Sequence, residues 1–174
     1  MKNQYKVLLV EGDKVEQEKI IETLKKTKLK YDFTISESVA SAKLALASEN
    51  FDMAIVDSVL ADGTCFDIFN LNLDIPIIVL AANGNENLAV NVMKEGACDY
   101  IIKDSERTYL KNLPLAVEDA IQRHKHQAQT RLLSNILMNI SDSVYITNYE
   151  DKIIFVNHYF SKLYGYIPAE VIGK

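Results

Sequence analysis

The chain has 174 residues, of which 48% are hydrophobic and 25% are charged, a composition typical of soluble globular domains. Its net charge of −5 argues against a general surface for nucleic acid or for an anionic membrane. The two cysteines, Cys65 and Cys98, belong to no CxxC or Cys/His cluster, so we expect reduced, packed thiols in a cytoplasmic protein. No apolar run has the length of a membrane span, and none near the N-terminus suits a signal peptide.

Hydrophobic periodicity predicts short strands that alternate with helices. Continuous apolar runs suit strands buried on both faces, as in a parallel sheet, whereas the alternation of Phe33 and Ile35 with polar neighbours suits a half-exposed strand. The five predicted strands are residues 7–10, 33–35, 53–56, 75–80 and 100–102. Apolar residues at helical spacing predict helices at residues 14–27, 39–50, 65–71 and 88–96, with Asp13, Ser38 and Gly96 as capping residues.

This alternation is the pattern of a doubly wound, five-stranded parallel α/β sheet with flanking helices. Right-handed crossovers leave few strand orders, and the order 2-1-3-4-5 puts strands 1 and 3 side by side where the winding reverses. Three of the predicted strands end in a charged residue, namely Glu11, Asp57 and Lys103. Because the carboxyl ends of parallel strands meet at one sheet edge, we expect these side chains to share a crevice.

Two carboxylates and one ammonium group at one sheet edge permit two interpretations. Adjacent carboxylates repel unless a cation neutralises them, and Mg²⁺ favours one or two carboxylates together with water and phosphate oxygens. A lysine beside them suits a phosphoryl group, so the cluster is compatible with phosphoryl transfer onto Asp57. The alternative is a charge-balanced cluster that tolerates partial burial, and these residue types alone favour neither.

Four ordered motifs occur at the strand ends: VLLVEGD (7–13), MAIVDSVLADG (53–63), IPIIVLAAN (75–83) and GACDYIIKD (96–104). Together they resemble the receiver domain of response regulators, over roughly residues 4–125. The resemblance implies that Asp57 accepts a phosphoryl group from a sensor histidine kinase or phosphotransfer protein, and that Lys103 pairs with that group. It also implies that Glu11, Asp57 and the backbone carbonyl of Val59 hold Mg²⁺.

The chain departs from the family pattern around this site. Gly12 stands where a second metal-binding acid is usual, so we expect weak Mg²⁺ binding, with Asp13 as a further candidate ligand unless it caps the next helix. Ala81 stands where the family has a phosphoryl-binding hydroxyl, which puts in question the coupling of the switch aromatic, Tyr100, to phosphorylation. The segment after Asp62 is short and predicts a stunted third helix.

Residues 114–140 are predicted to form one helix that leaves the receiver domain. Pro114 is expected to begin it, because proline is tolerated in a first turn. Its middle, residues 122–131, is too polar for a globular core, which favours pairing of two chains as a coiled coil. The alternative is a solvated single helix, and His124 and His126 are interpreted as solvated.

Residues 141–174 change character. Alternating segments at residues 144–147 and 153–156 predict a hairpin, and a short helix follows near residues 160–164. This piece, through its GY-x-P-x-E-x-IG segment, resembles the start of a PAS sensory domain and is too small to enclose a ligand pocket. We expect it to be poorly ordered alone or to help pair two chains, with His158 at the surface.

The sequence thus predicts a receiver domain at residues 1–125, a linker helix at 114–140 and an incomplete PAS domain at 141–174. The leading hypothesis is a two-component receiver, not an enzyme beyond its own phosphoryl transfer, that relays its state through the helix to a PAS-containing output. The alternative is a scaffold for dimerisation or docking that works without phosphorylation, in which Gly12 and Ala81 record lost chemistry. A phosphohydrolase with Asp57 as nucleophile is the weakest hypothesis, since further catalytic acids are missing.

Overall fold

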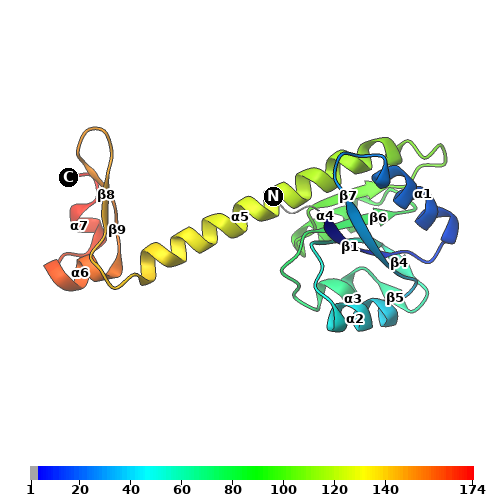
Figure 1. Cartoon of the computed structure of the whole chain (residues 1–174), viewed down its shortest axis with the longest axis horizontal. Helices are drawn as coiled ribbons and strands as arrows, with labels where there is room; N and C mark the ends of the chain where they lie inside the picture. The colour runs from blue at the N-terminus through cyan, green and yellow to red at the C-terminus, as the bar shows by residue number, and fades with distance from the viewer. Residues whose placement is uncertain (1–3) are drawn as a thin grey trace. The chain divides into compact units, whose positions relative to one another are not determined.

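The structure, a computed structural model, describes residues 4–174. The chain divides into two compact units, Met1–His124 and Lys125–Lys174. The first unit contains a five-stranded parallel sheet of order β2-β1-β3-β6-β7, shown in Figure 1. Its strands are β1 (Tyr5–Val10), β2 (Tyr31–Ser36), β3 (Met53–Asp57), β6 (Ile77–Ala81) and β7 (Asp99–Ile102). In sequence order of the five strands this is 2-1-3-4-5, so the predicted doubly wound sheet is confirmed.

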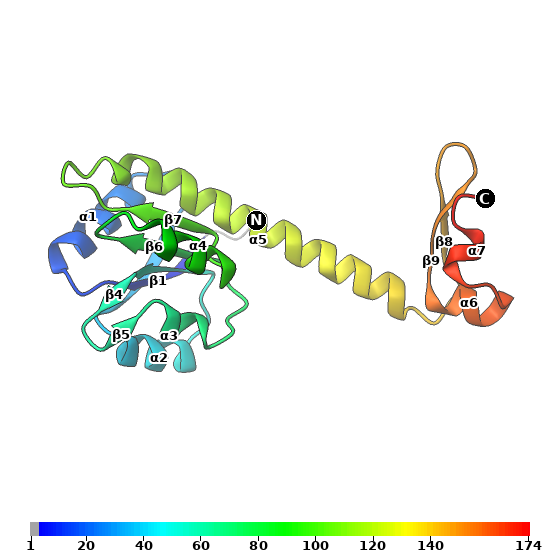
Figure 2. The ribbon, with the colours of Figure 1, turned by 180° about the vertical axis from the view of Figure 1, so that it is seen from behind.

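Helices cover both faces of the sheet (Figure 2). They are α1 (Lys14–Lys25), α2 (Val39–Ser48), α3 (Phe66–Phe69), α4 (Glu86–Lys94) and α5 (Tyr109–Asn139). Alternate strand residues point to opposite faces, so one core forms against α1 and α5 and the other against α2, α3 and α4. Ile55 belongs to the first core and Val56 to the second, and both are fully buried. The unbroken apolar runs of the central strands β3 and β6 follow from this burial on two faces.

The β3–α3 connection holds a small hairpin that periodicity did not predict. It pairs β4 (Val59–Leu60) with β5 (Gly63–Thr64) in antiparallel fashion. Asp62 at its turn accepts hydrogen bonds from the backbone nitrogens of Val39 and Ala40, at 2.7 and 2.9 Å. These two bonds lower the pKa of Asp62, and they tie the hairpin to the start of α2. Helix α3 is only 4 residues long, in agreement with the short third helix expected.

The predicted start of α5 at Pro114 was wrong. The helix begins at Tyr109, and Pro114 lies inside it. Tyr109 and Leu113 are both buried in the core against α1, so their burial extends the helix toward its N-terminus despite the hydrogen bond that proline cannot donate. The prediction that His124 is solvated was also wrong, since its side chain is 26% exposed and Nε2 lies 3.4 Å from Asp74 Oδ1.

The second unit contains the predicted hairpin. Strands β8 (Tyr145–Thr147) and β9 (Ile153–Val156) pair in antiparallel fashion, and helices α6 (His158–Tyr164) and α7 (Pro168–Val171) follow. Asn157 Oδ1 accepts from the nitrogens of Val144 and Phe160, at 3.0 and 2.9 Å. These bonds join the hairpin to α6. The resemblance to a PAS domain and the expected poor order stay predictions.

Within residues 4–174, no helix combines the length and the apolar character needed to cross a membrane. Both cysteines are free thiols, as expected. Burial raises the pKa of the Cys65 thiol to about 11, so this group stays protonated and unreactive near neutral pH.

Candidate phosphoacceptor site

Glu11, Asp57 and Lys103 meet at the carboxyl edge of the sheet, as strand-end chemistry predicted. Each side chain stands at or just beyond the end of its own strand, β1, β3 or β7. Lys103 Nζ lies 2.6 Å from Asp57 Oδ2 and 2.9 Å from Glu11 Oε2. The three residues line a depression of about 470 Å³, together with Asp13 and Ser105. An ammonium group therefore sits between two carboxylates at the mouth of a solvent-accessible pocket.

Burial and charge act in different ways on the members of this cluster. Glu11 is 2% exposed, and its burial raises the pKa of its carboxyl despite hydrogen bonds from the Asp13 backbone and Lys103. For Lys103, burial alone lowers the pKa, but the hydrogen bonds to Asp57 and Glu11 outweigh it and the pKa is raised. Lys103 is therefore firmly protonated at neutral pH and offers a fixed positive charge.

The two carboxylate oxygens of Asp57 have different surroundings. Oδ2 is bound tightly by Lys103, whereas Oδ1 lies 3.4 Å from Val59 N and 3.5 Å from Ser58 Oγ. These long contacts leave Oδ1 the less strongly held of the two oxygens. A reacting group that approaches Asp57 from the pocket would therefore bond to Oδ1 at the lower cost.

The residues that could hold a metal ion form an incomplete acid set. Asp13 Oδ1 accepts from Val15 N at 2.8 Å and so caps α1, while Asp13 N donates to Glu11 Oε1 at 3.0 Å. Gly12 carries no carboxylate, although a Cβ added there would meet only Glu37 O, at 3.7 Å. Within residues 4–174, no group of three His, Cys, Asp or Glu side chains could hold a metal. Two carboxylates and a backbone carbonyl still match what Mg²⁺ requires when water and phosphate supply the other ligands.

Ala81 and Tyr100 lie on neighbouring strands beside the site. Ala81 is 1% exposed and has no hydroxyl to offer. Tyr100 is half-buried, and its hydroxyl donates to the backbone carbonyl of Asn83 at 3.3 Å. The Tyr100 hydroxyl is thus bonded to the loop that follows β6.

Comparison with known proteins decides the family. Residues 7–113 match the model of the response regulator receiver domain. The chain belongs to this family. Receiver domains are the parts of two-component systems that interact with histidine kinases or phosphotransfer proteins, and they catalyse in general nothing beyond their phosphoryl transfer.

Relatives of this receiver are found in plants and bacteria. The two-component response regulator ORR21 of Oryza sativa subsp. indica is 33% identical over 116 residues, which cover 62% of this chain and 16% of the rice protein. The non-phosphorylated HemR receiver domain of Leptospira biflexa is 26% identical, with a TM-score of 0.59 over 67% of this chain and 94% of that one. The Mn²⁺-bound form of response regulator Rcp1 is 19% identical, with a TM-score of 0.58 over 63% and 89% of the two chains, a likeness in fold.

Glu16 also lines this pocket of the receiver and was not predicted to belong to the site. Glu16 Oε1 lies 3.0 Å from Arg107 Nε, and its Oε2 accepts a short hydrogen bond from the Tyr109 hydroxyl. Burial, and secondly the bond to Glu16, raise the pKa of Tyr109. The cluster joins α1 to the start of α5. No local pattern reveals it, because Glu16 is separated from its partners by 91 and 93 positions in the sequence.

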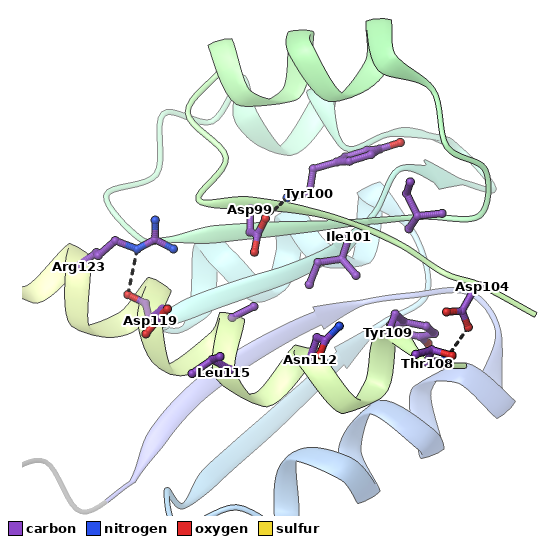
Figure 3. Close-up of a pocket in the computed structure, with 12 residues that line it drawn as sticks. Asp99, Tyr100, Ile101, Asp104, Thr108, Tyr109, Asn112, Leu115, Asp119 and Arg123 are labelled. Atoms are coloured by element: carbon purple, nitrogen blue, oxygen red, sulfur yellow. Dashed lines mark hydrogen bonds between the residues drawn. The ribbon is translucent and has the colours of Figure 1, made fainter. Parts of the chain in front are cut away.

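A second pocket of the receiver, of about 510 Å³, lies between β7 and the first half of α5. Figure 3 shows Asp99, Asp104, Asp119 and Leu115 along its walls. Asp104 Oδ1 accepts from Thr108 N at 2.5 Å and so supports the turn before α5. Asp57 and Lys103 line the pocket of about 470 Å³ and do not line this second one.

Proposed function

We propose that Asp57 of this receiver accepts a phosphoryl group from a sensor histidine kinase or a phosphotransfer protein. One observation carries the proposal: Lys103 Nζ contacts both Asp57 and Glu11 at the mouth of a pocket at the carboxyl edge of the sheet. The buried lysine supports the phosphoacceptor function over a scaffold without chemistry, because such a charged cluster costs desolvation and gains little stability by itself.

In the proposed step, Asp57 Oδ1 attacks the phosphorus of a donor phosphohistidine. The Oδ1–P bond forms as the P–N bond breaks, and the imidazole keeps the electron pair and later takes a proton from water. Lys103 stays protonated throughout and neutralises charge that develops on the phosphoryl oxygens. Oδ1 is the attacking atom because Lys103 already binds Oδ2.

We further propose that Mg²⁺ takes part, held weakly by Glu11, Asp57 and the Val59 carbonyl. When bound, the ion supplies charge neutralisation for the phosphoryl oxygens. Weak binding is expected because Gly12 lacks a carboxylate and the Asp13 carboxylate caps α1. The Mn²⁺-bound form of Rcp1, which has the same fold, supports the binding of a divalent ion.

The output is proposed to run through α5 to a PAS-containing region in a cytoplasmic homodimer. The helix is continuous over Tyr109–Asn139, and its second half exposes Leu132, Leu133 and Ile136. An apolar helix face of this kind favours pairing with a second copy. The chain spans only 16% of ORR21, so the activity of the whole protein is part of the proposal.

The test is phosphorylation of the whole 174-residue chain by acetyl phosphate and Mg²⁺, followed by intact mass. The wild-type protein should gain the mass of one phosphoryl group, and Asp57→Asn should not. Asp62→Asn serves as a matched control, because it changes an acid in the same connection but keeps an oxygen that can cap α2. No gain in folded wild-type protein at high donor and Mg²⁺ concentrations would favour the scaffold.

A further inference from the structure

Ser58 is a buried hydroxyl beside the reacting carboxylate, and neither motif nor spacing singled it out. Ser58 is 5% exposed, and its Oγ lies 3.5 Å from Asp57 Oδ1. Its backbone is held at both ends, since Ser58 N donates to Leu80 O at 2.7 Å and Ser58 O accepts from Cys65 N at 3.2 Å. The hydroxyl is therefore held close to the less strongly bound oxygen of Asp57.

The register of the sheet puts Ser58 next to Ala81. Strands β3 and β6 pair Asp57 with Leu80, and the bond from Ser58 N to Leu80 O continues this ladder. The next residues along are Ser58 and Ala81, which stand beside each other at the spacing of neighbouring strands, about 5 Å. Both lie on the same side of the sheet, because paired residues in a parallel ladder share a face.

We infer that the Ser58 hydroxyl binds the phosphoryl group on Asp57 and supplies the polar contact that Ala81 lacks. The inference rests on the proposed function. Once Oδ1 is bonded to phosphorus, the phosphoryl oxygens extend beyond Oδ1, and the nearest donors in place are Val59 N and Ser58 Oγ. Ser58 donates a hydrogen bond and keeps its proton. The bonds that form and break are those of the transfer from donor to Asp57.

The negative charge of the phosphoryl group strengthens the hydrogen bond from the Ser58 hydroxyl. Lys103 already binds Asp57 Oδ2 and Glu11 Oε2, so one of its three N–H donors remains for the phosphoryl oxygens. A hydroxyl in a water-poor position gives a charge-assisted bond, which is stronger than a neutral one. Loss of one such donor slows a reaction with developing negative charge by about tenfold or more.

The experiment measures the rate of phosphorylation of the full chain by acetyl phosphate at fixed Mg²⁺, with intact mass as the readout. Ser58→Ala should lower the second-order rate constant by about tenfold while the unfolding midpoint stays near that of the wild type. Ser58→Cys keeps the volume but is a weak donor, and should also slow the reaction. Ser36→Ala is the control, since Ser36 is a buried serine at the end of β2 whose side chain makes no hydrogen bond to Asp57 within residues 4–174.

A rescue variant separates chemistry from structure. Ala81→Ser places a hydroxyl beside position 58, so it should restore most of the rate in the Ser58→Ala background, which a packing effect would not do. If the wild-type protein and Ser58→Ala are phosphorylated at rates within twofold of each other, the inference about Ser58 is overturned and the proposed function is not. A folded wild-type chain that gains no phosphoryl group would overturn both this inference and the proposed function.

Discussion

At the scale of single residues, the ammonium group of Lys103 balances the charge of the two carboxylates in the site. Its side chain is 12% exposed and contacts two carboxylates, one of them almost fully buried. The desolvation cost of such a lysine is offset only while both partners remain. Removing the ammonium group leaves Glu11 buried without its cation, which costs more than the pair itself contributes.

Lys103→Met should therefore lower the free energy of unfolding by about 3 kcal/mol at neutral pH. The pKa of Lys103 is raised in the folded chain, so its contribution is fully present below the ordinary lysine pKa and is lost as pH rises through the raised value. Urea unfolding of both proteins over a pH series measures this. A difference in stability that grows with pH in the alkaline range would contradict the assignment.

Gly12 offers a direct test of the metal site. Because a Cβ at this position meets only the Glu37 carbonyl at 3.7 Å, Gly12→Asp should fit and supply a further carboxylate. We expect Mg²⁺ to bind about tenfold more tightly, measured by calorimetric titration. Asp13→Asn is the control, since asparagine keeps the cap of α1, and it should change the affinity by less than twofold. A large loss in Asp13→Asn would instead make Asp13 a ligand.

Tertiary contacts set the ends of elements against local sequence preferences. Helix α5 starts five residues before Pro114, because Tyr109 and Leu113 pack into the core with α1. The proline then lies where its missing N–H leaves a carbonyl of the first turn without its usual donor. Burial at 109 and 113 outweighs this local cost.

Replacing the proline should expose that cost. Pro114→Ala is expected to raise the free energy of unfolding by about 1–2 kcal/mol, since the regained hydrogen bond outweighs the stability lost when the unfolded chain gains conformational entropy. Denaturant unfolding measures the change. Leu115→Ala is the neighbouring control, because Leu115 is mostly exposed and its loss should alter stability by less than about 0.5 kcal/mol. A destabilised Pro114→Ala would mean that the proline favours the helix start.

At the scale of the whole molecule, the exposed apolar residues of α5 bear on how two copies of the chain associate. Leu132, Leu133 and Ile136 are exposed in the second half of α5, within the Lys125–Lys174 unit. A single solvated helix is not expected to expose three large apolar side chains within two turns. Pairing with a second copy would bury them.

We expect the chain to form a dimer, measured by sedimentation equilibrium. The double change Leu133→Glu and Ile136→Glu should weaken it by at least a factor of about 100, because it places charge in a buried apolar seam. Gln129→Glu, on a polar position of the same helix, should weaken it far less. A wild-type chain that stays monomeric at every concentration would contradict the proposed dimer.

Strand-end residues show how far sequence alone reaches. Continuous apolar runs that stop at Glu11, Asp57 and Lys103 were enough to predict the parallel sheet and the meeting of these three side chains, since strand direction fixes where their ends lie. The four motifs then predicted the family, which residues 7–113 confirm. Hydrophobic periodicity carries this information because a strand that is buried on both faces consists of consecutive apolar residues.

Other features depended on contacts between distant positions. The Glu16–Tyr109 bond, the bonds from the start of α2 to Asp62 and the bond from Ser58 N to Leu80 O leave no local pattern, because each joins residues that are far apart in the sequence. The start of α5 likewise followed burial and not the proline. The sequence determined which strands form and which charged residues stand at their ends. Tertiary packing decided which donor faces which oxygen, because a contact of a few ångströms depends on the whole fold.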